Sequence, residues 1–118
     1  MSDMKNDYRL KGRIWIETGG QTFIGEGKAI LLKKTAELGS LRKASAELEM
    51  SYRHAWYSLN KMNKAVGKPV ILLHRGGKSG GIAEITEFGA EILKIFERSQ
   101  RDFEKFLNNQ SVKLNSYA

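Results

Sequence analysis

One short stretch rich in glycine and cations, RGGKSGG at residues 75–81, is the first candidate for chemistry. A glycine-rich loop with a lysine is typical of nucleotide sites, where G-x-x-x-x-G-K-[ST] precedes a helix whose amides and dipole hold the phosphates. Here Leu72 occupies the first glycine position, and two further glycines follow Ser79 where the helix would begin. The stretch therefore does not match a nucleotide-binding loop.

A glycine-rich hairpin tip is the second interpretation of this stretch. Four glycines let the backbone approach a polyanion closely, while Arg75 and Lys78 reach phosphate groups or a minor groove. The alternative is a hairpin that is simply solvated.

The net charge of +7 is concentrated in the segment that contains this stretch. Residues 51–85 carry five of the seven net positive charges, because Glu84 is their only acid. Such an excess predicts a polyanionic partner, and nucleic acid is favoured over a membrane because the segment lacks a continuous apolar face. The cations are Arg53, Lys61, Lys64, Lys68, Arg75 and Lys78.

Side chains suited to catalysis or metal binding are few. The sequence has no cysteine, only His54 and His74 as histidines, and no HExxH, GxSxG or paired-carboxylate motif. We therefore predict no enzyme activity, no metal site and no cofactor. No apolar run approaches the roughly 20 residues of a membrane span, and the polar N-terminus has no signal-peptide core, so we expect a cytoplasmic protein without membrane association.

A single domain of residues 1–109 must position the cationic groups, since 118 residues with 41% hydrophobic side chains support one modest core. Residues 9–17 alternate apolar and polar side chains, which predicts a half-buried strand. Turn residues then lead to a short return strand at 22–24, so 9–25 are predicted to form a β-hairpin.

Three helices are predicted over residues 27–66. The first spans about 27–38, where apolar residues recur at helical spacing, and ends at Gly39. Ser40 and Ser51 are then predicted to cap the other two helices.

These two later helices span about 41–48 and 52–66, with only Glu49 and Met50 between the first of them and Ser51. So tight a connection after a short, alanine-rich helix is typical of a helix-turn-helix.

Residues 70–85 follow as strand, glycine-rich tip and strand, which is the pattern of a wing. Thr86 is predicted to cap a long helix over 87–108, and residues 110–118 are predicted to be a polar tail. The predicted fold class is α+β, mainly α: a winged helix-turn-helix with an N-terminal β-hairpin and a long C-terminal dimerisation helix.

Apolar residues of that last helix recur at spacings of four and three, like a coiled-coil seam interrupted by one serine. A small domain has little core to cover so long an apolar edge, so we expect a second copy of the chain to contact it. The alternative is that the helix folds back on its own domain. The predicted dimer interface consists of Ile92, Phe96, Ser99, Phe103 and Phe106.

Several motifs together resemble one known family. The run GSLRKASAELEMSYRHAWYSLNKMN at residues 39–63, followed by RGGKSGG and then ITEFG at 85–89, resembles the DNA-binding domain of molybdate-responsive transcriptional regulators, the ModE family. The resemblance covers about residues 8–108. The helix-turn-helix also resembles that of LysR-type regulators, but the Ser-Tyr-Arg-x-Ala-Trp run, the Met-Asn pair and the glycine-rich wing favour the ModE family.

This resemblance implies a homodimeric transcription regulator that places one recognition helix of each protomer in the major groove of double-stranded DNA. Arg53 is the main candidate for reading bases, because a guanidinium pairs with guanine in bidentate fashion, although a solvated helix face is the alternative. For Trp56, packing against the core is the alternative to DNA contact. The predicted DNA-binding residues are Ser40, Ser51, Tyr52, Arg53, His54, Trp56, Tyr57, Lys61, Lys64, Arg75 and Lys78.

Two departures from the family pattern limit what the resemblance implies. Full-length members carry a C-terminal molybdate-binding domain that the predicted polar tail does not form, so we expect a stand-alone DNA-binding member or one that senses an effector through another chain. Ser79 stands where the family's wing tends to have glycine. Winged helices also bind proteins and RNA, so a non-enzymatic interaction module is the alternative function.

Overall fold

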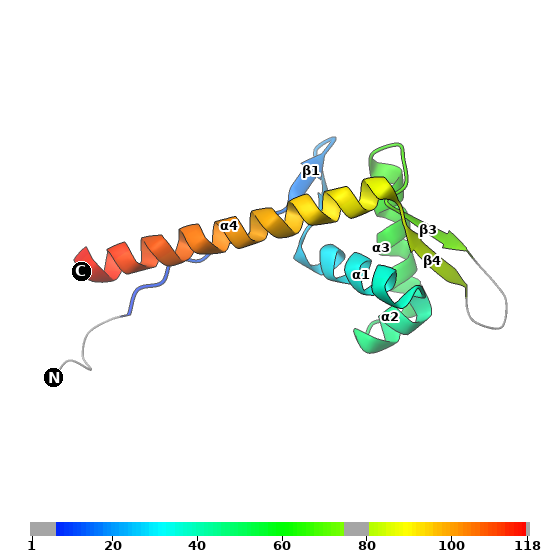
Figure 1. Cartoon of the computed structure of the whole chain (residues 1–118), viewed down its shortest axis with the longest axis horizontal. Helices are drawn as coiled ribbons and strands as arrows, with labels where there is room; N and C mark the ends of the chain where they lie inside the picture. Colours follow the sequence, from blue (N-terminus) through cyan, green and yellow to red (C-terminus); the bar gives the residue numbers. More distant parts are fainter. Residues whose placement is uncertain (1–6, 75–80, 118) are drawn as a thin grey trace.

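The computed structural model describes residues 7–74 and 81–117. Within these residues, four helices and two antiparallel β-hairpins form a mainly helical fold, which confirms the predicted mixture of helices and hairpins (Figure 1). None of these helices is long and apolar enough to cross a membrane. The elements are β1 (Ile16–Thr18), β2 (Gln21–Ile24), α1 (Glu26–Leu38), α2 (Leu41–Glu47), α3 (Tyr52–Ala65), β3 (Ile71–His74), β4 (Ile82–Ile85) and α4 (Glu87–Tyr117).

The ends of the first three helices follow the predicted caps. Gly39 ends α1 with a φ of 66°, and its amide donates to the Thr35 carbonyl at 2.9 Å. The hydroxyls of Ser40 and Ser51 accept hydrogen bonds from amides three residues further on, at 3.2 and 3.1 Å. Because the first amides of a helix have no partner within the helix, these serines determine where α2 and α3 begin.

The turn between α2 and α3 is closed by two backbone hydrogen bonds. The Met50 amide donates to the Ser45 carbonyl at 2.9 Å, and the Glu49 amide donates to the Ala46 carbonyl at 3.1 Å. This pair of bonds is a Schellman motif, which requires a left-handed residue after the helix. Glu49 fills that position with a φ of 55°, at a cost of about 1 kcal/mol for a residue with a Cβ atom.

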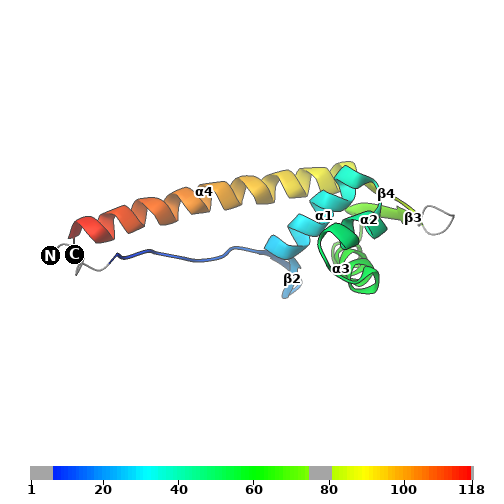
Figure 2. The same cartoon turned by 90° about the horizontal axis from the view of Figure 1, so that it is seen from below.

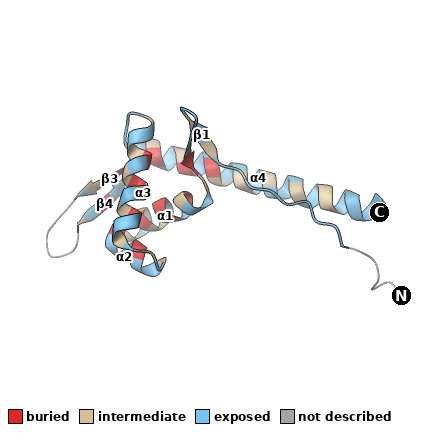
Figure 3. Cartoon of the chain, turned by 180° about the vertical axis from the view of Figure 1, so that it is seen from behind, coloured by how far each residue is buried: buried red, intermediate tan, exposed pale blue. Residues whose placement is uncertain are grey.

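The hydrophobic core lies in residues 14–97, which we call the head. Buried positions cluster in α1, α2, α3, the hairpins and the first turns of α4 (Figure 3). One buried polar group, the Thr35 hydroxyl, donates to the Leu31 carbonyl at 2.7 Å, so its burial leaves no unpaired donor. The largest fully buried side chains are Phe96, Ile24, Leu32, Leu59, Met62, Ile71, Val70 and Thr35.

The first turn of α4 is fixed against the residues that precede β3. The Thr86 hydroxyl accepts a hydrogen bond from the Gly89 amide at 2.9 Å, which confirms the predicted cap. The same hydroxyl lies 2.8 Å from the Pro69 carbonyl and 3.0 Å from the Val70 carbonyl, and it donates its one proton between them. A side-chain carbon at Gly89 would lie 2.7 Å from the Val70 carbonyl carbon, so this approach requires glycine.

The predicted strand over residues 9–17 is wrong for most of its length. β1 begins only at Ile16, which lies opposite Ile24 of β2. Residues 7–15 instead run extended along α4 (Figures 1 and 2). Their alternation is consistent with this course, because Ile14 packs against the core while its neighbours are exposed. An extended segment on a helix needs the same period of two as a strand in a sheet.

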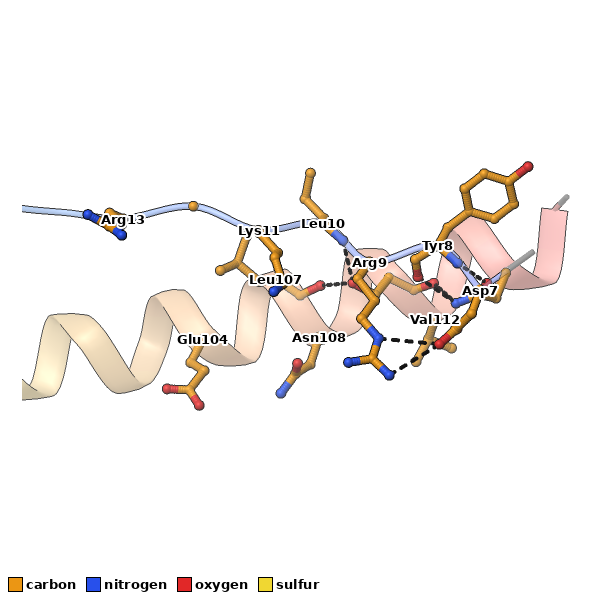
Figure 4. A pocket seen from close by; sticks show the side chains of 13 residues that line it. Asp7, Tyr8, Arg9, Leu10, Lys11, Arg13, Glu104, Leu107, Asn108 and Val112 are labelled. Atoms are coloured by element: carbon orange, nitrogen blue, oxygen red, sulfur yellow. Dashed lines mark hydrogen bonds and ion pairs between the residues drawn. The ribbon is translucent and has the colours of Figure 1, made fainter.

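Polar side chains of α4 replace the neighbouring strand as hydrogen-bond partners. The Leu10 amide donates to the Ser111 hydroxyl at 2.8 Å, and the Tyr8 amide donates to Asn115 Oδ1 at 2.9 Å (Figure 4). Asn115 Nδ2 also donates to the Tyr8 carbonyl at 2.8 Å. We call residues 7–13 together with 98–117 the stalk.

The predicted helix end at Asn108 and the predicted polar tail at 110–118 are also wrong, since α4 continues to Tyr117. After Gly89 the sequence contains no glycine or proline that would stop a helix. With 31 residues, α4 extends about 46 Å and gives the molecule its elongated shape of 65 × 30 × 21 Å.

Candidate nucleic-acid interface

The helix α3 has a buried face and an exposed cationic face. Its buried residues are Ala55, Leu59 and Met62. At about 100° per residue, the side opposite to this buried face carries Arg53, Tyr57 and Lys64, all of them exposed. The helix contains no acidic residue, so no carboxylate of its own offsets these cations.

Two further stripes of α3 flank this exposed face. Tyr52 and Trp56 line a small cleft on the side of β3 and β4, and both pack against the core. For Trp56 this placement matches the core-packing interpretation. His54 and Lys61 lie on the other side, toward α1, and are exposed. The predicted residues of α3 therefore lie on its exposed face and on the two stripes that flank this face.

The two capping serines differ in exposure. Ser51 is exposed at the start of α3, on the same end as Arg53. Ser40 is only 5% exposed, and its hydroxyl is engaged in the α2 cap. The Ser40 side chain therefore stabilises α2 from within the head, and its predicted contact with DNA stays a prediction.

Arg42 of α2 extends the cationic face beyond α3, although it is absent from the predicted set. Its guanidinium carbon lies 4.6 Å from the centre of the Tyr52 ring, which is a cation–π contact. Ten residues separate Arg42 from Tyr52, so no helical periodicity relates them. Their contact depends on how the turn at Glu49 packs α2 on α3.

Asn63, the second residue of the Met-Asn pair, connects α3 to β3. Its Oδ1 accepts hydrogen bonds from the Val70 amide at 2.8 Å and the Ile71 amide at 3.1 Å, and its Nδ2 donates to the Ile71 carbonyl at 2.8 Å. These bonds fix the end of α3 relative to the hairpin that follows it. The sequence shows the residue but not this role, because a polar residue near a helix end has many local partners.

The strands β3 and β4 form the hairpin predicted over residues 70–85. They pair antiparallel, with Ile71 opposite Ile85 and His74 opposite Ile82. The predicted contacts Arg75 and Lys78 lie outside the described residues. His74 Nε2 lies 3.8 Å from the Glu84 carboxylate, which makes an ion pair when the imidazole is protonated.

The predicted seam of α4 divides into a buried part and an exposed part. Phe96 is 1% exposed and belongs to the core of the head, so it has no surface to offer a second chain. Ile92 also packs against that core. At these two positions α4 packs on its own domain, as the alternative expects.

Farther along α4, the apolar residues lie in the stalk. A side chain at Gly12 would meet the Phe103 ring at 2.9 Å, so the extended N-terminal segment covers part of Phe103. The rings of Phe103 and Phe106 stack with centroids 6.3 Å apart, and Phe106 is 52% exposed. The Ser99 hydroxyl donates to the Ile95 carbonyl at 2.9 Å.

A metal centre has no candidate in the described part of the chain, where no group of three or more His, Asp or Glu residues could hold an ion. In the groove between the N-terminal segment and α4 (Figure 4), Arg9 pairs with Asp7, and Ser111 and Asn115 bind the backbone of the N-terminal segment. The cationic surface of α3 and Arg42 is thus the arrangement best suited to bind a large anion.

Comparison with known proteins finds that the chain is similar to proteins named ModE and Mop. No protein-family model matches it. It is 33% identical over 97 residues to the transcriptional regulator ModE of Haemophilus influenzae, covering 80% of this chain and 38% of the relative. It is 25% identical over 107 residues to the molybdenum transport protein ModE of Azotobacter vinelandii, covering 91% and 40%. It is 29% identical over 105 residues to the molybdenum-pterin-binding protein MopB of Rhodobacter capsulatus, covering 89% and 38%.

The chain thus spans about two fifths of the length of these relatives. Several of the similar proteins are named as transcriptional regulators, including one named as a DNA-binding dual regulator in Escherichia coli. These names agree with the resemblance of the motifs to the ModE family.

Proposed function

We propose that this chain is a sequence-specific, double-stranded DNA-binding transcription regulator with a winged helix-turn-helix, acting as a homodimer. The observation that carries the proposal is the exposed face of α3, where Arg53, Tyr57 and Lys64 stand opposite the buried side of a helix without acids. In this proposal α2 and α3 are the helix-turn-helix, and β3 and β4 with their connecting residues are the wing.

Each part of this surface has its own task in the proposal. Arg53, in the first turn of α3, reads a base edge in the major groove, where one bidentate contact contributes about 1–3 kcal/mol of discrimination. Lys61, Lys64 and Arg42 contact phosphates, which position the helix but carry no sequence information. Asn63 keeps the hairpin in a fixed position beside the recognition helix.

The homodimer part of the proposal rests on the exposed apolar residues of the stalk. Because these side chains lie on a helix that extends away from the head, a second α4 can cover them and hold two recognition helices at a fixed spacing. Two residues of the predicted seam, Phe106 and the partly covered Phe103, lie in this part of α4. The exposed apolar residues of α4 beyond the head are Phe106 (52%), Val112 (68%), Leu114 (41%) and Tyr117 (94%).

Selection of binding sites from a random duplex DNA pool tests the proposal. The wild type is expected to enrich a palindrome with half-sites about one helical turn apart, and Arg53→Ala is expected to lose this enrichment. Arg101→Ala is the matched control, because Arg101 is an exposed arginine of the stalk away from α3. Enrichment that survives in Arg53→Ala would remove Arg53 from base readout.

Salt dependence separates DNA binding from the alternative, a protein- or RNA-interaction module. If α3 and α2 neutralise phosphates of duplex DNA, log K is expected to fall by about 0.9 per phosphate contact for each tenfold increase in salt. Lys64→Ala is expected to weaken binding to all duplexes about equally and to lower this slope. A weak, salt-independent affinity for duplex DNA that Arg53→Ala does not change would favour the interaction module.

A further inference from the structure

A groove at the edge of the exposed face of α3 lies between α1, the α2–α3 turn and the flank of α3. It has a volume of about 540 Å³, in the range of sites for small molecules. α1 and α3 contact each other in the head, and residues of both helices line the groove. Its apolar walls are Ile30, Leu31, Leu48, Met50 and the ring of Tyr57.

The apolar wall is unusually open to solvent for its composition. Ile30 is 49% exposed and Tyr57 is 60% exposed, whereas Leu31 beneath them is only 2% exposed. Large apolar side chains gathered around one depression mark a binding surface more often than side chains scattered singly. The groove therefore presents an apolar floor and rim that a ligand can remove from water.

Two lysines give this groove a defined charge. Lys28 of α1 and Lys61 of α3 both line it, and no acidic residue does so among the described residues. Burial and, secondarily, the nearby Lys61 ammonium lower the pKa of Lys28. Neither lysine forms an ion pair in the described part of the chain, so the two positive charges repel without a counter-charge. An anion between them would relieve that repulsion.

The amino end of α1 contributes positive potential at the same place. Gly27 lines the groove, and the Gly25 cap of α1 has no side-chain hydrogen bond. A side-chain carbon at Gly27 would meet nothing within 4 Å, so the space beside this end of the helix is open. The partial charge of a helix start has the same sign as the two ammonium groups.

We propose that this groove binds a small organic carboxylate with an aromatic or branched aliphatic body. The body lies against Ile30, Met50 and Tyr57, and the carboxylate lies between Lys28 and Lys61. Inorganic phosphate would leave the apolar walls in water, and an uncharged hydrocarbon would leave the ammonium groups without a partner. One anionic group on an apolar body satisfies both parts of the groove.

Occupancy of the groove affects the surface of α3, because His54, Tyr57 and Lys61 belong to both. A bound carboxylate neutralises Lys61 and covers one edge of the Tyr57 ring, so it is expected to weaken DNA binding. This coupling rests on the proposed function, whereas the groove itself does not.

Titration of the isotopically labelled protein with 1-naphthoate, followed by NMR, tests the groove directly. We expect saturable shifts confined to the amides of residues 26–31, 48–50 and 54–61. The uncharged analogue 1-naphthalenemethanol is expected to bind at least about tenfold more weakly, because it loses the charge-assisted hydrogen bonds. Absent shifts, shifts spread over the whole molecule, or equal affinity for both compounds would overturn the proposal.

Paired variants locate the site by affinity. Ile30→Glu is expected to abolish 1-naphthoate binding, whereas Ile95→Glu, a change at an isoleucine of α4 that is also 49% exposed, is expected to leave it unchanged. Lys28→Gln should weaken binding about tenfold, and the exposed Lys94→Gln should not. Equal losses in a variant and its control contradict the site, and Lys28→Gln keeps the test valid if Ile30→Glu fails to fold.

Competition with the selected DNA duplex distinguishes the groove from the proposed function. 1-Naphthoate at saturation is expected to lower DNA affinity in the wild type and to do so much less in Lys28→Gln at the same concentration. If NMR shows binding in the groove but DNA affinity stays the same, the coupling is wrong. If the protein binds no duplex at all, the proposed function fails while the NMR result still decides the groove.

Discussion

Asn63 in the head and Asn115 in the stalk make nearly the same contact in different surroundings. Each side chain accepts from and donates to the backbone of an extended segment outside its own helix, residues 70–71 for Asn63 and Tyr8 for Asn115. The partners of Asn63 are fully buried, whereas Asn115 is exposed and Tyr8 is 42% exposed. Water can therefore replace the contact of Asn115 more readily than that of Asn63.

The same contrast holds for the head and the stalk as a whole. All of the buried residues among those described belong to the head, including those of the first turns of α4. In the stalk, a few hydrogen bonds and the half-buried Phe103 hold the N-terminal segment to α4. The head has the burial expected of a cooperative unit, while the stalk presents apolar surface that remains available to another chain.

Replacing a glycine in the head is expected to have the largest effect on stability. Gly89→Ala places a methyl group against the Val70 backbone and should lower the free energy of unfolding by about 3 kcal/mol. Gly27→Ala is the matched control, because the exposed space beside Gly27 accepts a methyl group and the helix gains about 0.5 kcal/mol. Urea denaturation measures both, and a stable Gly89→Ala would disprove the close approach of α4 to Val70.

Replacing the two asparagines tests the comparison itself. Asn63→Leu leaves the Val70 and Ile71 amides without partners and should cost about 2 kcal/mol. Asn115→Leu exposes the Tyr8 backbone to water and should change the free energy of unfolding by less than about 0.5 kcal/mol. Similar losses in the two variants, measured by urea denaturation, would show that the stalk is as cohesive as the head.

A smaller effect is expected at the boundary between the two regions. The Lys33 ammonium of α1 lies 3.1 Å from the Glu97 carboxylate of α4, and both side chains are partly exposed. Glu97→Gln should therefore lower the free energy of unfolding by less than about 1 kcal/mol, and 1 M salt should reduce the difference further. Glu104→Gln in the stalk serves as the control, and an equal loss there would assign the effect to general charge rather than to this pair.

Local signals in the sequence predicted most of the head correctly. Ser40, Ser51 and Thr86 cap helices as expected, and Gly39 ends α1, because each of these roles depends on a residue's own backbone and its immediate neighbours. The hairpin of β3 and β4 follows from its apolar strands for the same reason.

Contacts between distant segments account for the errors. The period of two in residues 9–17 could not show whether a strand or a helix would lie beside it. The seam spacing of α4 places Phe96 and Phe106 on one stripe, but the position of the head along the helix decides that only Phe96 is buried. Neither helical periodicity nor strand alternation relates Arg42 to Tyr52 or Asn63 to β3, so the sequence did not indicate these two contacts either.

The spacing of hydrogen-bonding groups along the N-terminal segment matches that along α4 only over a limited length. Two residues of extended chain advance about 6.6 Å, and four residues of helix advance about 6.0 Å, so Tyr8 and Leu10 meet Asn115 and Ser111 almost in step. The extended segment therefore advances about 0.6 Å farther than the helix with every two of its own residues. After about five such pairs of residues this offset reaches half of the spacing between successive partner side chains on α4. The backbone amides of a longer extended segment would then no longer meet these side chains, so the extra residues would have to leave the helix.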